Sequence, residues 1–180
     1  MQSPQFGSLA SEPALTRPDL LAEPVESALH AWPRADEVAV AEIDPSLADT
    51  AALSEAYGVP MESSANCVVV LGRRGGDERI AACVVRATTR ADVNNLVKRT
   101  LDVRKASFLP TDRAVAETAM EYGGITPVGL PESFRVFVDA AVLDIPVAII
   151  GSGVRRSKLL LPGRLLGELP GAEVLERLGV

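Results

Sequence analysis

The most informative stretch of this chain runs Glu121-Tyr122-Gly123-Gly124-Ile125-Thr126-Pro127-Val128-Gly129-Leu130. Its paired glycines permit positive φ and allow another molecule to come into van der Waals contact with the main chain. Pro127 fixes its own φ and holds Thr126 extended. We therefore interpret the stretch as a rigid loop, poor in side chains, that forms a concave site. The alternative is a plain turn between a helix and a strand.

The segment from Gly123 to Gly129 resembles the Gly-Gly-(Ile/Val)-Ser-Pro-x-Gly signature of the YbaK/EbsC family, which removes wrongly attached amino acids from tRNA. The same domain is inserted in some prolyl-tRNA synthetases. The resemblance extends from about Ser46 to the C-terminus, and further motifs follow in the family's order, namely Ala51-Ala52-Leu53-Ser54-Glu55-Ala56-Tyr57-Gly58-Val59-Pro60, Asn66-Cys67-Val68-Val69-Val70, Val138-Asp139-Ala140 and Gly151-Ser152-Gly153-Val154-Arg155-Arg156. It implies a single α/β (α+β) domain with helices packed around a mixed β-sheet, and a deacylase that hydrolyses mischarged aminoacyl-tRNA in trans.

One position departs from the family pattern. The family's strand opens with Lys-(Thr/Ser), whereas this chain has Asn66-Cys67 there. A neutral amide gives weaker electrostatic assistance than an ammonium group. Three readings stay open: Asn66 donates to the substrate carbonyl in a modified deacylase, another cation such as Lys98 or Lys105 reaches the pocket, or the domain is an inactive module that binds aminoacyl-tRNA.

The resemblance also implies roles for individual residues, with the two glycine-rich loops forming the editing pocket. The catalytic set is Asn66, Gly123, Gly124, Ser152 and Gly153. The substrate-binding set is Ile125, Thr126, Pro127, Asp139 and Gly151. Either Gly151 or Ser152 matches the family's small residue before its glycine. The residues expected to contact tRNA are Lys105, Arg155 and Arg156.

The residue inventory excludes several other chemistries. His30 is the only histidine, so neither a Ser/His/Asp triad nor a His/Cys metal cluster can be assembled, and we expect no metal or cofactor. Cys67 and Cys83 lie in apolar strand patterns and are expected to pack as reduced thiols in a cytoplasmic protein. We expect no secretory signal and no membrane span, because the apolar runs fall far short of about 20 residues.

Charge is distributed unevenly along the 180 residues. The formal net charge is −6, yet residues 1–60 carry two basic and ten acidic side chains, whereas residues 61–180 carry sixteen basic and fourteen acidic ones. Basic residues gather at Lys98-Arg99, Arg104-Lys105 and Arg155-Arg156 with Lys158. A local patch of this kind suits contacts with tRNA phosphates, although an ordinary solvated surface fits equally well. The expected partners are the acceptor end of aminoacyl-tRNA and, as a further candidate, an aminoacyl-tRNA synthetase.

Periodicity and turn signals predict the order of elements. We expect residues 1–16 to form a flexible tail and residues 17–180 to form the folded domain. Predicted helices span 24–32, 49–57, 92–101, 112–120 (capped by Asp112) and 172–178. Predicted strands span 38–43, 67–71, 80–85, 105–109, 134–142, 147–150 and 157–161. The continuous apolar runs at 67–71 and 80–85 predict strands that are covered on both faces.

Overall fold

The computed structural model describes residues 6–180. Its strands are β1 (Ser11–Pro13), β2 (Ala39–Glu42), β3 (Ala65–Arg74), β4 (Asp77–Arg86), β5 (Lys105–Phe108), β6 (Phe134–Asp139), β7 (Ala148–Gly151), β8 (Ser157–Leu161) and β9 (Ala172–Leu175). Its helices are α1 (Glu23–Ala31), α2 (Thr50–Tyr57), α3 (Lys98–Thr100) and α4 (Thr111–Thr118), with a π-helical segment η6 (Val93–Val97) leading into α3. The expected α/β class is confirmed.

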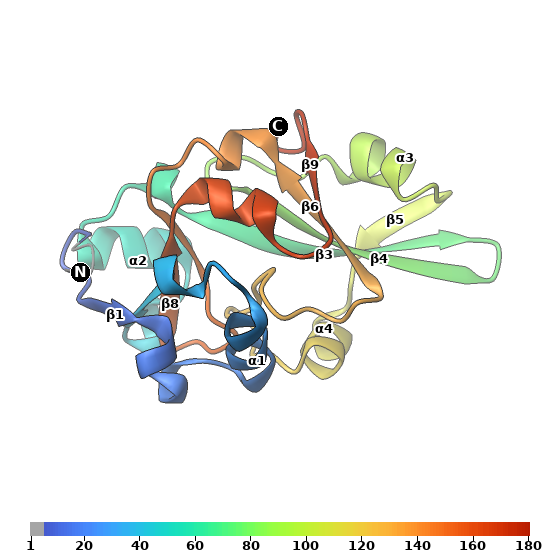
Figure 1. The fold of residues 1–180 in the computed structure, drawn as a ribbon. Coiled ribbons are helices and arrows are strands. Elements are labelled where there is room, and N and C mark those ends of the chain that lie inside the picture. The colour runs from blue at the N-terminus through green and yellow to red at the C-terminus, as the bar shows by residue number, and fades with distance from the viewer. Residues whose placement is uncertain (1–5) are drawn as a thin grey trace.

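The strands form two sheets rather than the one that the sequence predicts. The first is antiparallel, in the order β1-β2-β8-β7, and the second is mixed, in the order β5-β3-β4-β6-β9. In the mixed sheet, β6 runs parallel to both β4 and β9. A parallel bridge from Ser64, just before β3, to Ile149 in the first half of β7 joins the sheets. Figure 1 shows β3 and β4 as a long ribbon whose turn projects at the opposite end of the molecule from α2.

Apolar packing explains why the two longest strands are continuous hydrophobic runs. In β3, Val70 packs into one buried cluster, while Val69 and Leu71 pack into another. In β4, Val84 joins the large cluster around α1, whereas Cys83 packs on the other face. The prediction that these strands are covered on both faces is confirmed.

Local signals place most helix ends correctly. Asp49 caps α2, its side chain accepting from the Ala51 N–H at 3.1 Å, and Gly58 ends the helix at φ +65°. The Asp92 carboxylate likewise caps η6. The predicted cap by Asp112 is wrong, because α4 begins one residue earlier, at Thr111, and has no side-chain cap.

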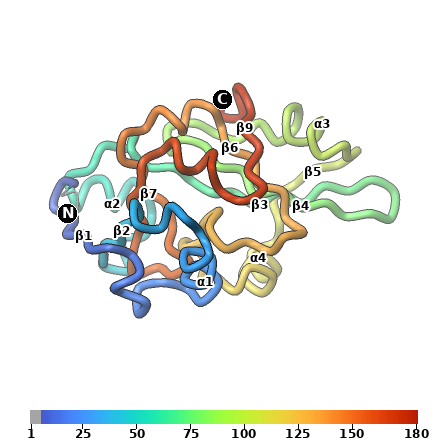
Figure 2. Tube along the Cα trace, in the orientation of Figure 1, coloured from blue at the N-terminus to red at the C-terminus, as the bar shows by residue number. Residues whose placement is uncertain are grey.

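The predicted flexible tail needs a correction over the residues that the structure describes. Strand β1 pairs antiparallel with β2, and Leu9 and Ala14 are buried. The Ser8 N–H also donates to the Tyr57 carbonyl at the end of α2. Figure 2 shows the N-terminal trace lying beside α2 and β2. Residues 1–5 of the predicted tail lie outside the described residues.

The predicted C-terminal helix at 172–178 is wrong. The chain forms β9 there, which extends the mixed sheet beside β6. An ion pair links the two strands at 2.7 Å, from Arg135 to Glu173. Parallel pairing with a strand almost 40 residues earlier outweighs the local helical pattern, because the sheet satisfies the backbone groups and covers part of the apolar face.

Candidate functional site

A cavity of about 470 Å³ opens near the junction of the two sheets. The N-terminal turn of α2, the beginning of β3, the end of β7, β8 and the loop after α4 form its walls. Each of these five elements contributes a polar group: Thr50, Asn66, Lys158 and the backbone of Gly123 and Gly151. Predicted site residues and potential hydrogen-bond donors therefore meet in this cavity.

Asn66 is held in a defined orientation at the beginning of β3. The Thr50 hydroxyl donates to Asn66 Oδ1 at 3.0 Å, from the first residue of α2. This bond uses the acceptor of the amide and leaves its Nδ2 group as a donor for a ligand. The N–H of Gly123, which also lines the pocket, has no backbone acceptor within residues 6–180. The pocket therefore offers two neutral donors.

Strand register places Lys158 beside Gly151, its antiparallel partner. An isolated parallel bridge joins Ser64, two residues before Asn66, to Ile149, two residues before Gly151. Asn66, Gly151 and Lys158 all line the pocket. Gly151 contributes no side chain to the wall that it shares with Lys158.

The glycine-rich loops pack against one another. A Cβ atom on Gly151 would lie 2.4 Å from the Gly124 carbonyl oxygen, and one on Gly124 would lie 2.7 Å from the backbone of Val154. The Gly153 N–H donates to the Gly124 carbonyl at 2.7 Å. Gly123, at φ +83°, adopts the predicted positive φ. From the sequence, a second molecule is expected to contact the main chain at the glycines. At Gly124 and Gly151 the space is instead filled by other parts of the same chain.

Several predicted site residues lie behind the pocket wall. Ser152 is fully buried, and its Oγ is 2.7 Å from the Ser157 Oγ. Thr126 is also buried, and its Oγ1 has no hydrogen-bond partner within the described residues. Of the predicted catalytic and substrate-binding residues, the pocket is lined by Asn66, Gly123, Ile125 and Gly151. Gly124, Thr126, Ser152 and Gly153 are not in direct contact with it.

Asp139 lies elsewhere in the fold. It is 3 % exposed at the end of β6, and its Oδ2 accepts from the Gly179 N–H at 3.2 Å. This carboxylate holds the C-terminal segment against the sheet. The structure therefore does not place Asp139 with the residues that line the pocket.

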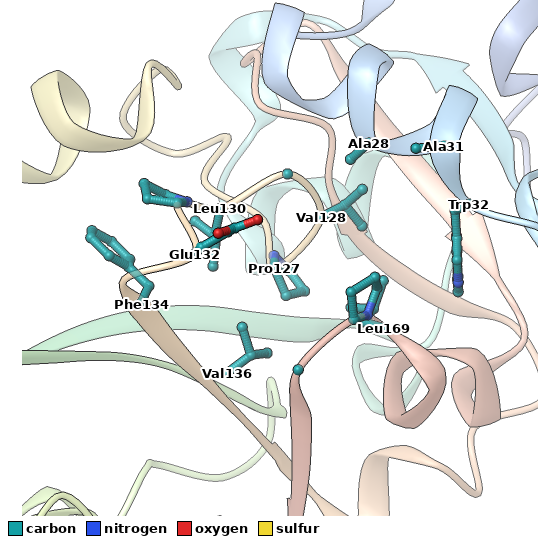
Figure 3. A pocket seen from close by; sticks show the side chains of 14 residues that line it. Ala28, Ala31, Trp32, Pro127, Val128, Leu130, Glu132, Phe134, Val136 and Leu169 are labelled. Carbon is teal, nitrogen blue, oxygen red and sulfur yellow. The ribbon is translucent and has the colours of Figure 1, made fainter.

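Pro127 lines a second cavity, of about 440 Å³, on the other side of the glycine loop. Figure 3 shows Val128 and Pro127 facing Trp32 and Leu169 across it. Apart from Glu132, its side chains are apolar or aromatic. A cavity with so few donors is poorly suited to stabilising a developing oxyanion.

The predicted tRNA contacts occupy two separate regions. Arg155 lies at the pocket, donating to the Tyr122 carbonyl at 3.1 Å and to the Pro45 carbonyl at 3.2 Å. Arg156 is exposed beside it and donates to the Asp19 carbonyl. Lys105, in contrast, pairs with Arg73 on β3. Seven residues separate Arg73 from Asn66, which corresponds to about 23 Å along a strand.

Lys158 is the pocket residue that the sequence analysis misses. Neither Lys98 nor Lys105 lines the pocket, so the reading in which one of them reaches it is wrong. Lys158 does line it and is only 8 % exposed. Burial and, to a smaller extent, the charge of nearby Arg155 lower the pKa of Lys158, against the opposing effect of the Asp49 carboxylate, to about 8. The available signal was a single lysine in a strand otherwise composed of Ser157 and leucines.

The remaining reactive groups do not suggest another chemistry. Cys67 lines the pocket, but burial raises the pKa of its thiol, and it raises that of Cys83 to about 12. The nucleophilic thiolate is therefore scarcely populated at neutral pH. Within residues 6–180, no group of three or more His, Cys, Asp or Glu side chains could hold a metal ion. No helix in the described part of the chain could span a membrane.

Relatives of known sequence match part of the chain. It is 32 % identical to the proline–tRNA ligase of Listeria welshimeri over 77 residues, and 31 % identical over the same length to that of Listeria monocytogenes. These segments cover 42 % of this chain but only 13 % of each ligase.

Solved structures match most of the fold. A structure described as "Crystal structure of a putative trans-editing enzyme for prolyl tRNA synthetase" has a TM-score of 0.73 and 21 % identity, covering 86 % of this chain and 94 % of that one. A second, of a hypothetical protein, has a TM-score of 0.75 and 22 % identity, covering 88 % of this chain and all of that one.

A family model described as the aminoacyl-tRNA editing domain matches residues 44–168, more than half of the chain. The match contains Asn66, both glycine-rich loops and Lys158, so it includes every residue that lines the pocket. The protein belongs to the aminoacyl-tRNA editing domain family.

Proposed function

We propose that the protein is a trans-editing deacylase that hydrolyses the ester bond between a wrongly attached amino acid and the 3′ end of tRNA. The observation that carries this proposal is the pocket at the junction of the sheets, which is lined both by the oriented amide of Asn66 and by Gly123, whose N–H has no backbone acceptor within residues 6–180. Membership of the editing family and the fold shared with a structure named as a trans-editing enzyme support it.

The chemistry needs little beyond positioned donors. When water adds to the ester carbonyl, negative charge develops on the carbonyl oxygen, and preorganised N–H groups stabilise it. Asn66 Nδ2 and the Gly123 N–H are suited to this task. Ile125 and Gly151 bound the space for the amino-acid side chain, and small pockets discriminate by only about 1–3 kcal/mol per methylene.

In this proposal the substrate does not touch Gly124, Ser152 or Gly153, which support the residues that line the pocket. The hydrogen bond from the Gly153 N–H to the Gly124 carbonyl joins the two loops, and the contact between Ser152 and Ser157 anchors the second loop to the beginning of β8. Rigid loops keep donors in place without reorganisation during the reaction. These three residues are therefore positioning residues rather than groups that touch the ester.

The tRNA would approach over the exposed rim of the pocket. Tyr122 is 64 % exposed there, and its ring is available to stack on a terminal base. Arg155 and Arg156 lie beside it for phosphate contacts, which position a nucleic acid without reading its sequence. Lys105 would meet a more distant part of the acceptor stem. An aminoacyl-tRNA synthetase as partner, and the cytoplasm as the site of action, belong to the same proposal.

A second candidate function is a module that binds aminoacyl-tRNA without cleaving it. It is favoured by one observation, the uncharged Asn66 at the strand position where the resemblance expects lysine. Such a module would retain the rim contacts and the pocket but lack turnover.

The experiment that separates the two candidates is a deacylation assay. The purified protein is incubated with tRNAs carrying labelled amino acids, including alanyl- and cysteinyl-tRNA specific for proline, beside the correctly charged prolyl-tRNA. Release of the label from a mischarged tRNA, faster than spontaneous hydrolysis, supports the deacylase. Saturable binding with no release from any member of the panel contradicts it and favours the binding module.

A further inference from the structure

Lys158 is an unusual residue to find in a buried strand. Of the chain's three lysines it alone is buried, at 8 % exposure. Within residues 6–180 its ammonium group makes no ion pair and no hydrogen bond to another residue. Burial of a charge without a partner is costly, so lysines in such positions are rarely tolerated for packing alone.

Within the described residues the fold offsets this cost only in part, through the charge of the Asp49 carboxylate. Residues on the same face of β8 as Lys158 include Leu160, which packs among the apolar side chains beneath α2, with Leu53 and Ile149. A leucine or methionine at position 158 would continue this apolar face. The lysine instead directs its polar end into the pocket, whose lining also contains the buried and unpartnered Oγ of Ser64.

Two polar groups without partners in the lining of one cavity indicate that a polar ligand completes the site. Asn66, Gly151 and Lys158 all line that cavity, and Gly151, the strand partner of Lys158, adds no side chain beside it. We propose, on the basis of the editing function above, that Lys158 replaces the missing lysine at position 66 and donates from the opposite strand to the carbonyl oxygen of the aminoacyl ester.

The reaction then balances without a further reactant. A water oxygen bonds to the carbonyl carbon, and the electron pair of the C=O bond moves onto the carbonyl oxygen beside the Lys158 ammonium. Collapse breaks the bond to the ribose oxygen, which takes one proton that the water supplied. The products are the free amino acid and a tRNA with an intact 3′ terminal ribose.

The neighbouring charges favour Lys158 over Arg155 for this role. The Arg155 guanidinium already donates to the carbonyls of Tyr122 and Pro45, which holds it at the rim. Its positive charge and the Asp49 carboxylate are the charged groups that act on Lys158, with opposite effects. Lys158 is thus the cation in the pocket that remains free to engage a ligand.

The test compares four proteins: wild type, Lys158→Met, Lys158→Met combined with Asn66→Lys, and Arg90→Met as a control that also replaces a cation by methionine. Arg90 is exposed and does not line the pocket. Steady-state deacylation of the preferred mischarged tRNA gives kcat and KM. Lys158→Met is expected to lower kcat about 10²–10³-fold with KM little changed, as for loss of one oxyanion donor. The double variant is expected to regain at least about tenfold, because the charge returns from the other strand, and Arg90→Met should stay within about twofold.

The outcomes separate the inference from the function on which it rests. If the wild type is active and the kcat of Lys158→Met is within about threefold of the wild-type value, the role of Lys158 is overturned. The proposed deacylase function is unaffected by that result. A loss that Asn66→Lys fails to rescue also overturns the assignment, because position rather than charge would then be responsible.

If the wild type releases no amino acid, the proposed deacylase function is contradicted. The role of Lys158 is then tested by measuring the affinity for a substrate analogue. The probe is a stable analogue in which an amide replaces the ester of alanyl-adenosine. A loss of affinity of about tenfold or more in Lys158→Met supports the contact with the carbonyl. Equal affinity of the two proteins for the analogue overturns it.

Discussion

The hydroxyl of Thr50 donates to Asn66 Oδ1 at 3.0 Å, which couples the first turn of α2 to the first residues of β3. The bond fixes which end of the amide faces the pocket. A donor held in this way needs no rearrangement when charge develops on the substrate.

Removing the donor is the first prediction. Asn66→Ala should lower kcat for deacylation by about 10²–10³-fold, the usual cost of one oxyanion donor. Thr50→Val removes only the orienting bond, worth about 0.5–1.5 kcal/mol, and should reduce kcat by roughly three- to tenfold. Measuring kcat of both variants on the same tRNA tests whether Asn66→Ala has the larger effect. An effect of Asn66→Ala below about threefold would show that this amide is not the donor.

A methyl group at Gly151 should disturb the pocket. Its Cβ would lie 2.4 Å and 2.7 Å from the carbonyl oxygens of Gly124 and Ile125, so Gly151→Ala must displace the loop that carries Gly123. We expect at least about a tenfold loss of activity and about 1–3 kcal/mol lower stability. Gly76→Ala is the control, since nothing lies within 4 Å of its added Cβ in the hairpin turn. Urea titrations and deacylation rates of both variants provide the comparison, and equal behaviour would contradict the close approach.

Lys158 should reduce stability at neutral pH. Its pKa falls from 10.5 to about 8 in the folded protein, so the unfolded chain binds more protons between these values. The free energy of unfolding therefore rises with pH from about 8 to 10.5, and the penalty is fully present below about pH 8. Lys158→Met should stabilise the protein by about 1–3 kcal/mol at pH 7, and by less at pH 10.

Denaturant midpoints at both pH values measure this effect. Lys105→Met, at an exposed position, should leave the midpoint unchanged. A Lys158→Met variant that is less stable than wild type at pH 7 would show that the ammonium has a partner in the fold.

Arginine contacts with tRNA should appear in the salt dependence of binding. Arg156→Ala should weaken uncharged and charged tRNAs about equally and reduce the slope of log affinity against log salt by about one unit. Arg155→Ala should do the same and also raise KM, because the rim loses its bonds to Tyr122 and Pro45. Affinities measured at several salt concentrations test both expectations. An unchanged slope would identify Arg156 as an ordinary surface residue.

The exposed ring at the rim gives a further prediction. Tyr122→Ala should weaken binding of the substrate by about 1–3 kcal/mol if the ring stacks on a base, whereas Tyr122→Phe should retain most of the affinity. The alanine and phenylalanine variants share the same backbone contact to Arg155, which makes them a matched pair. Equal losses in the two would assign the effect to the hydroxyl instead of stacking.

The sequence predicts those parts of the fold that depend on local signals. Continuous apolar runs locate β3 and β4, and Gly58 marks the end of α2. Pairing between distant segments is not visible in such signals. The segment around Ser11–Pro13 is a strand only because β2 is beside it, and Ala172–Leu175 is a strand only because β6 is.

The site follows the same division. Backbone-rich motifs identify the two loops, and the strand start identifies Asn66 as a pocket residue. Lys158 is 92 residues from Asn66 in sequence and meets the pocket only through the register of β7 with β8. Asp139 is the opposite case. Its motif predicts a role in the pocket, but the sequence does not reveal that its carboxylate accepts a hydrogen bond from the Gly179 N–H.

Strand β1 has a consequence for the behaviour of the protein in solution. It is three residues long, ends in Pro13 and covers one edge of β2, whose other edge pairs with β8. An uncovered strand edge is a template for pairing with other molecules, and a short edge strand containing proline and a charged residue such as Glu12 is a poor one. The first residues of the described chain therefore protect the antiparallel sheet from aggregation. A variant that begins at residue 17 would lack β1, and the edge of β2 that β1 covers would be open to self-association.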